Sequence, residues 1–86
     1  AGFTPPRDQV EQLLANLWCE LLGVAEVSVH QRFLALGGDS LQAIRLVARL
    51  SQQLGIELSL TDFFDAPTIA EQAALVETLL LQEPLS

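Results

Sequence analysis

Gly37–Leu41, with the sequence Gly-Gly-Asp-Ser-Leu, lies near the middle of the chain and decides how the rest of it is interpreted. A glycine pair and an acid come directly before a serine, and a long amphipathic pattern starts at that serine. Asp39 is a favoured N-cap type, and Gln42 stands three residues further on, in the capping-box arrangement. Helix N-termini attract phosphate, because free N–H groups and the helix dipole both favour negative charge. We therefore expect Ser40 at a helix start, with an outward hydroxyl suited to attaching or holding a phosphate-containing group.

Ser40 has two interpretations, a functional serine and an ordinary serine at a helix start. The glycine pair before it favours the first. Asp39 already serves as a cap, so Ser40 is not needed as one. Glycine adopts backbone angles that other residues avoid, and it leaves room for another molecule to come close. Gly37 and Gly38 together exceed what a simple helix stop requires, and they favour the functional interpretation.

Four helical patterns, three long and one short, predict an all-α fold, a small four-helix bundle. The first helix is expected over residues 8–22, where apolar residues recur at steps of three and four, and Gly23 ends it. The second is expected over residues 40–54 and stops at Gly55. Its inner face is expected to consist of apolar residues: Ala43, Ile44, Val47, Ala48, Leu50 and Leu54.

Capping signals predict the two remaining helices. Ser59 caps a short helix that reaches Phe64, and Thr68–Glu71 opens a last helix that ends near Gln82. Adjacent helical residues cannot point the same way, so one of Phe63 and Phe64 is expected in the core and the other near the surface. The last helix is expected to bury an apolar stripe: Ile69, Ala73, Val76 and Leu80.

The chain divides into a linker over residues 1–7, a folded domain over 8–82 and a tail over 83–86. Prolines stiffen the linker and oppose a helix there. Residues 24–39 form a long connection, and a loop of this length in a small domain is usually functional. Four apolar residues are expected to hold it to the core: Val27, Val29, Phe33 and Leu36.

The composition is that of a small acidic domain with 86 residues, a net charge of −7 and 50% hydrophobic residues. A negative charge disfavours nucleic acid as a partner. No apolar run approaches the roughly 18 residues of a membrane span. Cys19 is the single cysteine, so no internal disulfide is expected, and no signal-peptide pattern opens the chain. These features predict a cytoplasmic location.

An enzymatic alternative comes from the same stretch, because Gly38–Leu41 spells the serine motif of an esterase family. Such enzymes need a histidine base and an acid on a larger α/β scaffold. No strand is predicted before Ser40, and the single histidine, His30, stands ten positions earlier in the loop. Cys19 fits a small, mostly buried hydrophobe, and no His, Cys or carboxylate cluster has metal-ligand spacing. We expect neither a catalytic nor a metal site.

Three parts of the chain together resemble carrier (thiolation) domains of modular assembly lines. Val29–Leu41 (VHQRFLALGGDSL) is similar to the core motif of peptidyl carrier domains. Trp18 matches in the first helix, and Asp62–Ile69 (DFFDAPTI) matches at the junction of the third and fourth helices. The resemblance covers nearly the whole chain and implies an acyl-carrier-protein-like bundle. The chain departs from the pattern at positions where acids or a second aromatic are common: Gln31, Leu34 and Ala35.

The resemblance implies a covalent cofactor, 4′-phosphopantetheine, on Ser40, with Gly38, Asp39 and Leu41 around it. A phosphopantetheinyl transferase with Mg²⁺ would install it from coenzyme A. The thiol of the arm would hold an aminoacyl or peptidyl group as a thioester, and the carrier would do no chemistry itself. It would present that thioester to the adenylation, condensation and epimerisation or thioesterase domains of a non-ribosomal peptide synthetase in antibiotic biosynthesis. A flexible tether raises the effective concentration at each site.

Contacts with these partners are expected at Leu41, Ile44 and Arg45, and at Phe63 or Phe64 on the short helix. The second helix carries no acid from Ser40 to Leu54, which favours a peptidyl carrier over the fatty-acid type, whose second helix is acidic. The alternatives are an acyl carrier of a polyketide or hybrid assembly line and an acidic helical protein-binding module without a prosthetic group. The isolated domain is expected to be monomeric.

Overall fold

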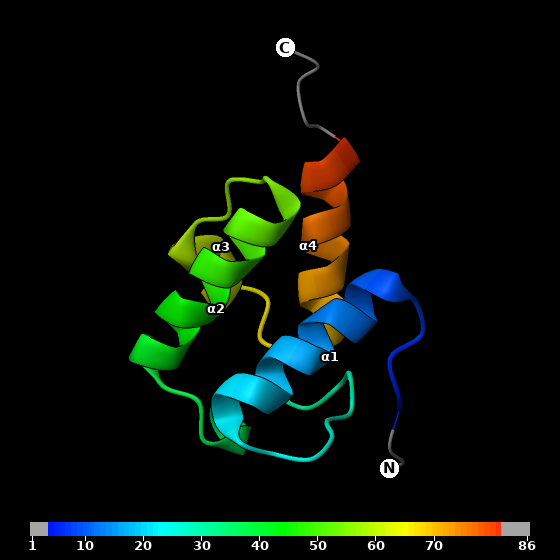
Figure 1. Ribbon diagram of the computed structural model, residues 1–86, viewed down its shortest axis with the longest axis vertical. Coiled ribbons are helices and arrows are strands. Elements are labelled where there is room, and N and C mark those ends of the chain that lie inside the picture. The colour runs from blue at the N-terminus through cyan, green and yellow to red at the C-terminus, as the bar shows by residue number, and fades with distance from the viewer. Residues whose placement is uncertain (1–3, 82–86) are drawn as a thin grey trace.

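The computed structural model describes residues 4–81 and has the predicted all-α fold, with three long helices and one short one (Figure 1). The α-helices are α1 (Gln9–Leu22), α2 (Ser40–Leu54), α3 (Leu60–Phe64) and α4 (Ile69–Leu81). A 3₁₀-helix, η1 (Leu34–Leu36), lies in the connection between α1 and α2, which the sequence predicted only as a loop. The described residues form no strand, and only an isolated antiparallel bridge joins Arg32 to Thr68.

Local capping sets the boundaries of α1 and α2. The sequence predicted the Asp39 cap and the ends at Gly23 and Gly55, whereas Asp8, which was expected inside the first helix, is the N-cap before it. Asp8 caps α1 by accepting a hydrogen bond from a first-turn amide at 2.8 Å, and Gly23 closes the helix in the left-handed region with φ of 71°. Asp39 caps α2 by accepting from the Gln42 amide at 2.9 Å, and Gly55 closes α2 with φ of 65°. The first residue of α2 is therefore fixed by the residue before it.

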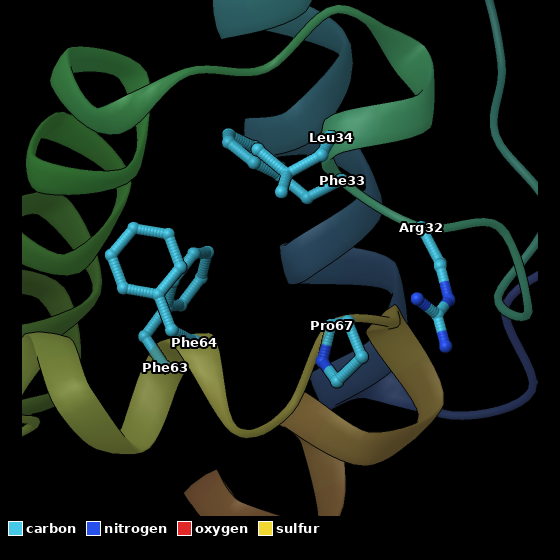
Figure 2. A pocket seen from close by; sticks show the side chains of 6 residues that line it. All are labelled: Arg32, Phe33, Leu34, Phe63, Phe64 and Pro67. Carbon is cyan, nitrogen blue, oxygen red and sulfur yellow. The ribbon is translucent and has the colours of Figure 1, made fainter.

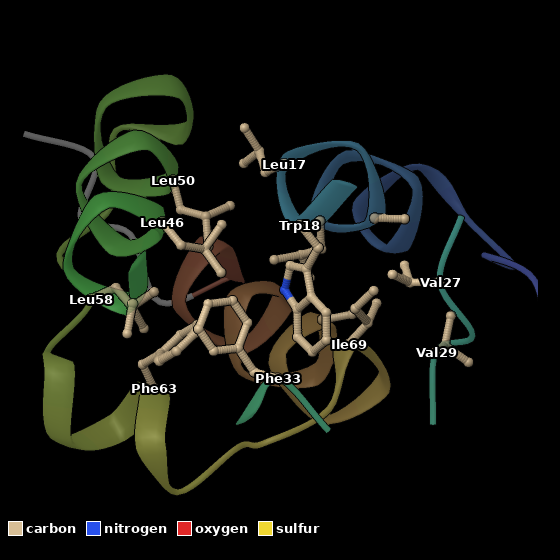
Figure 3. Close-up of a cluster of buried hydrophobic side chains, with 14 residues drawn as sticks. Leu17, Trp18, Val27, Val29, Phe33, Leu46, Leu50, Leu58, Phe63 and Ile69 are labelled. Carbon is tan, nitrogen blue, oxygen red and sulfur yellow. The ribbon is translucent and has the colours of Figure 1, made fainter. Parts of the chain in front are cut away.

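An aromatic row lies at the centre of the hydrophobic core (Figure 3). The buried amide of Gln72 lies next to it. Trp18 meets Phe33 edge-on with ring centroids 5.1 Å apart, and Phe33 meets Phe63 in the same way at 5.6 Å. The indole Nε1 of Trp18 donates to Oε1 of Gln72 at 3.0 Å. Nε2 of Gln72 donates to the carbonyl of Ala66 at 2.9 Å. One fully satisfied side chain therefore joins α1, α4 and the segment between α3 and α4.

The predicted apolar faces of α2 and α4 need correction. In α2, Ile44 and Ala48 are exposed, whereas Leu46, which the predicted inner face omitted, is fully buried. In α4, Leu80 is 38% exposed and Gln72 takes a buried position. The spacing of apolar residues does not show which neighbours cover them. Since α2 packs against α1 and α3, the face that holds Ile44 stays open.

The segment before α1 lies against the fold. The Thr4 amide donates to Oγ of Ser28 at 3.0 Å, and the Thr4 carbonyl accepts from the Val29 amide at 2.9 Å. Arg7 and Glu11 form an ion pair at 2.7 Å. The division into linker, domain and tail stays a prediction, because residues 1–3, the tail 83–86 and the expected end of the last helix near Gln82 lie outside the described residues. None of the helices between residues 4 and 81 has the length and apolar character needed to cross a bilayer.

Candidate functional site

Ser40 is the first residue of α2, and its side chain is exposed. Within residues 4–81 its hydroxyl makes no hydrogen bond, because Asp39 caps the helix in its place. The amides of Ser40 and Leu41 also have no partner in this part of the chain, as is usual in the first turn of a helix. The first turn of α2 contains no acid. An accessible hydroxyl thus lies beside two free N–H donors, an arrangement that suits a phosphate ester.

The glycines before Ser40 serve two different purposes. Gly37 has φ of 95°, in the region that favours glycine, and it closes η1 by donating its N–H to the Leu34 carbonyl. Gly38 has an ordinary backbone, but a Cβ there would lie 2.3 Å and 2.4 Å from two ring atoms of Phe33. The glycine at position 38 is therefore required by the protein's own core, whereas the sequence had suggested unusual backbone angles and room for another molecule.

The predicted capping box of α2 is only half formed. The Asp39 carboxylate accepts from the Gln42 amide, but the Gln42 side chain does not reach back to the cap. Its Nε2 donates instead to the carbonyl of Leu21, in the last turn of α1, at 2.9 Å. The Gln42 side chain therefore bonds to α1, which is distant in the sequence, and not to the cap residue beside it.

An apolar surface surrounds the start of α2. The exposed fractions are 56% for Leu41 and 49% for Ile44 on α2, and 42% for Phe64 on α3. Arg45 is exposed beside Ile44. Phe63 is only 2% exposed and packs against Phe33, so it is not on the surface. The expectation that one phenylalanine is buried and the other near the surface is confirmed, and Phe64 is the one that a partner can reach.

Leu34 extends this surface, although the sequence did not predict a partner contact there. At 63% exposed it is the most open large apolar side chain of η1. Its only signal was its departure from the aromatic residue common in the family. Figure 2 shows Leu34 across a shallow cavity of about 80 Å³ from Phe64, with Pro67 and Arg32 along the rim. The lining residues are Arg32, Phe33, Leu34, Phe63, Phe64 and Pro67.

Other candidates for chemistry do not gather around Ser40. His30 is exposed in the loop, and Ser40 follows a 3₁₀-helix and a turn where the esterase pattern needs a strand. Cys19 is partly buried in α1; burial, and after it the charge of Glu26, raises the pKa of its thiol. In the described part of the chain no group of three His, Cys, Asp or Glu side chains is placed to hold a metal ion.

Comparisons with known proteins agree on one family. The family model described as "Phosphopantetheine attachment site" matches residues 12–76. Tyrocidine synthase 1 of Brevibacillus parabrevis is 40% identical over 79 residues, which cover 91% of this chain and 7% of that protein. Surfactin synthase subunit 3 of Bacillus subtilis (strain 168) is 40% identical over 72 residues, or 84% of this chain and 6% of that protein. The chain thus spans a small part of these relatives.

Solved structures match along most of the chain. A chain in the structure of the phosphopantetheine transferase Sfp in complex with coenzyme A and a peptidyl carrier protein gives a TM-score of 0.85 at 33% identity, over 88% of this chain and 99% of the other. The solution structure of an active-site mutant peptidyl carrier protein gives 0.87 at 32% identity, over 93% and 89%. This chain belongs to the phosphopantetheine attachment family of carrier domains.

Proposed function

We propose that this chain is a peptidyl carrier domain of a non-ribosomal peptide synthetase and that Oγ of Ser40 carries 4′-phosphopantetheine. The observation that carries the proposal is the exposed hydroxyl of Ser40 at the first residue of α2, which has no hydrogen-bond partner among residues 4–81 because Asp39 is the cap in its place. The family match and the peptide synthases among the relatives support it. When bound, the cofactor supplies a thiol that holds an aminoacyl or peptidyl group as a thioester.

The residues around Ser40 fit the attachment of a phosphate group. In the attachment, Oγ of Ser40 would lose its proton and bond to the phosphorus of the phosphopantetheine group, while the pyrophosphate bond of coenzyme A breaks and adenosine 3′,5′-bisphosphate leaves. Ser40 is exposed, so a transferase has access to it. The free amides of Ser40 and Leu41 and the positive end of the α2 dipole lie beside the new negative charge. Since Gly38 packs on Phe33, the turn before the serine stays close to the core and does not cover the hydroxyl.

The partners in this proposal are a phosphopantetheinyl transferase that uses coenzyme A and Mg²⁺, and the adenylation, condensation and epimerisation or thioesterase domains of the synthetase. In this proposal they dock on the surface made by Leu41, Ile44, Arg45 and Phe64, and the exposure of Leu34 supports its inclusion in that surface. The domain itself is not catalytic: it presents its cargo to the active sites of others. We expect it to be monomeric when isolated and to work in the cytoplasm.

Intact mass tests the attachment site. The chain is incubated with coenzyme A, Mg²⁺ and a broad-specificity phosphopantetheinyl transferase, beside Ser40→Ala. The expected result is one phosphopantetheine added to the native chain and none to the variant. A folded, initially unmodified chain that gains no mass would overturn the proposal, and a gain by Ser40→Ala would move the attachment site elsewhere.

Variants on α2 test the docking surface. Leu41→Ala removes exposed apolar area, and Arg45→Glu reverses an exposed charge. Both are expected to slow arm loading or aminoacylation by the cognate adenylation domain. Gln53→Glu, which adds a negative charge at an exposed position in the last turn of α2, is the matched control and should leave both rates unchanged. Native rates in both test variants would show that the surface is assigned wrongly.

A further inference from the structure

Within residues 4–81, one side-chain hydrogen bond joins the turn that carries Ser40 to a second helix. Nε2 of Gln42 donates to the carbonyl oxygen of Leu21 at 2.9 Å. The last carbonyls of a helix have no partner within that helix, and Leu21 lies in the last turn of α1. The bond therefore satisfies an otherwise open carbonyl and fixes the first turn of α2 against the end of α1.

The hydrogen bond to Leu21 fixes the orientation of the Gln42 side-chain amide, with Nε2 facing the Leu21 carbonyl. Oε1 of Gln42 is buried and has no partner within residues 4–81, which is unfavourable for a polar atom. The opposite orientation would place this oxygen against the Leu21 carbonyl, so that two acceptors would face each other. A second side-chain link between the same helices, Arg49 to Glu20 at 2.6 Å, joins groups that are 47% and 66% exposed. Such exposed pairs hold weakly.

We propose that Gln42 is a positioning residue for Ser40. Its N–H donor locks the first turn of α2 against α1 and keeps the Ser40 hydroxyl in the orientation that the transferase meets. Its role in transfer rests on the proposed function of Ser40. The contact between Gln42 and α1, which we call the lock, is present in the unmodified chain and does not depend on that function. Gln42 lies two residues from Ser40 and acts through the turn, in which Asp39 also accepts a hydrogen bond from the Gln42 amide and Gly38 packs on Phe33.

Two substitutions of similar reach separate the donor from other properties of the side chain. Gln42→Glu has nearly the same shape but no donor, and its charge faces the negative end of the α1 dipole. Gln42→Lys keeps a donor for the Leu21 carbonyl, suits a helix C-terminus and removes the unpaired Oε1. Gln53→Glu, at the other end of α2, is the control for the added charge.

Amide hydrogen exchange in the unmodified chain measures the lock directly. The amides of residues 42 and 43 bond to Asp39, so they report the opening of the first turn, and the Gly55 amide reports the far end of α2. In Gln42→Glu we expect the first two to exchange about twofold to tenfold faster, with Gly55 unchanged. Gln42→Lys and Gln53→Glu should match the native chain. Equal acceleration at Gly55 would reduce Gln42 to a general stabilising residue and overturn the proposal, as would native exchange in Gln42→Glu.

Transfer kinetics then test the role of the lock at Ser40. Gln42→Glu should lower kcat for phosphopantetheine transfer by a similar factor, with KM little changed, and Gln42→Lys should restore kcat. A change in KM alone, or failure of Gln42→Lys to restore kcat, would mean that Gln42 contacts the transferase and does not position Ser40. If the native chain accepts no phosphopantetheine, the proposed function fails and the role in transfer fails with it, while the exchange pattern still decides whether the lock exists.

Discussion

At the scale of single residues, Gly38 shows how a missing side chain can shape a site. A methyl group there would overlap the ring of Phe33, so Gly38→Ala must displace either the ring or the turn that leads to Ser40. We expect a loss of about 1–3 kcal/mol in the free energy of unfolding, typical of overpacking, measured by urea denaturation with Trp18 fluorescence.

Two variants check the cause of that loss. Gly37→Ala has open space for a methyl group but a φ of 95°, so it should lose only about 1 kcal/mol, from the backbone. Phe33→Leu provides a smaller neighbour, and on that background Gly38→Ala should be less harmful than in the native chain. A urea midpoint for Gly38→Ala equal to that of the native chain would show that the Phe33 ring moves aside without loss of stability.

A second prediction at this scale concerns the ion pair between Arg7, which precedes α1, and Glu11, in the first turn of α1. The hydrogen bond from Arg7 lowers the pKa of the Glu11 carboxyl below its ordinary 4.5, and the Glu11 side chain is only 6% exposed. The pair therefore stabilises the fold fully above pH 4.5, and this contribution is lost as the pH falls through the lowered pKa. In urea denaturation, Glu11→Gln should be less stable than the native chain at pH 6, and the difference should shrink toward pH 3. A difference independent of pH would mean that the charge of Glu11 has no part in it.

At the scale of helices, Gln72 joins α1, α4 and the segment between α3 and α4, so its loss should lower the stability of the fold. Gln72→Leu leaves the Trp18 indole N–H and the Ala66 carbonyl without partners in the core. With about 1–3 kcal/mol for each of the two buried unpaired groups, we expect a loss of about 2–6 kcal/mol, measured by urea denaturation. Gln52→Leu, on the exposed face of α2, is the control and should change stability little. Equal midpoints for the two variants would contradict this account.

The helices also show which features a sequence can predict. Both ends of α2 follow from Asp39 and Gly55, because a cap acts on residues within one turn of it. Ser40 could be selected for the same reason, together with the family motif around it. The roles of Gly38 and Gln42 could not be predicted. Gly38 depends on how the Phe33 ring packs, and Gln42 depends on a carbonyl of α1 that is distant along the chain. The open face at Ile44 likewise follows from which helices pack on α2 and not from its own pattern.

At the scale of the whole molecule, α3 places one phenylalanine in the core and exposes the other on the proposed docking surface. Phe63→Ala should lower the free energy of unfolding by about 3–5 kcal/mol, because its buried ring contacts Phe33. Phe64→Ala removes a ring that is 42% exposed, so it should leave stability nearly native while it slows aminoacylation by the partner adenylation domain. Thermal unfolding and loading rates measured together check both halves. A native loading rate in a folded Phe64→Ala domain would remove α3 from the docking surface.

The state of Cys19 has a consequence for a molecule that carries its cargo on a thiol. A thioester passes readily to any nearby thiolate, so a reactive cysteine in the carrier would capture the cargo or exchange with the arm. Burial raises the pKa of the Cys19 thiol. The groove that Cys19 lines is formed by α1, the segment before it and the loop after it, and it includes none of the residues of the proposed docking surface. The chain's own sulfur is therefore a poor competitor for the acyl group. A thiol-specific label applied at neutral pH should react first with the thiol of the arm and report directly how much of it is unloaded.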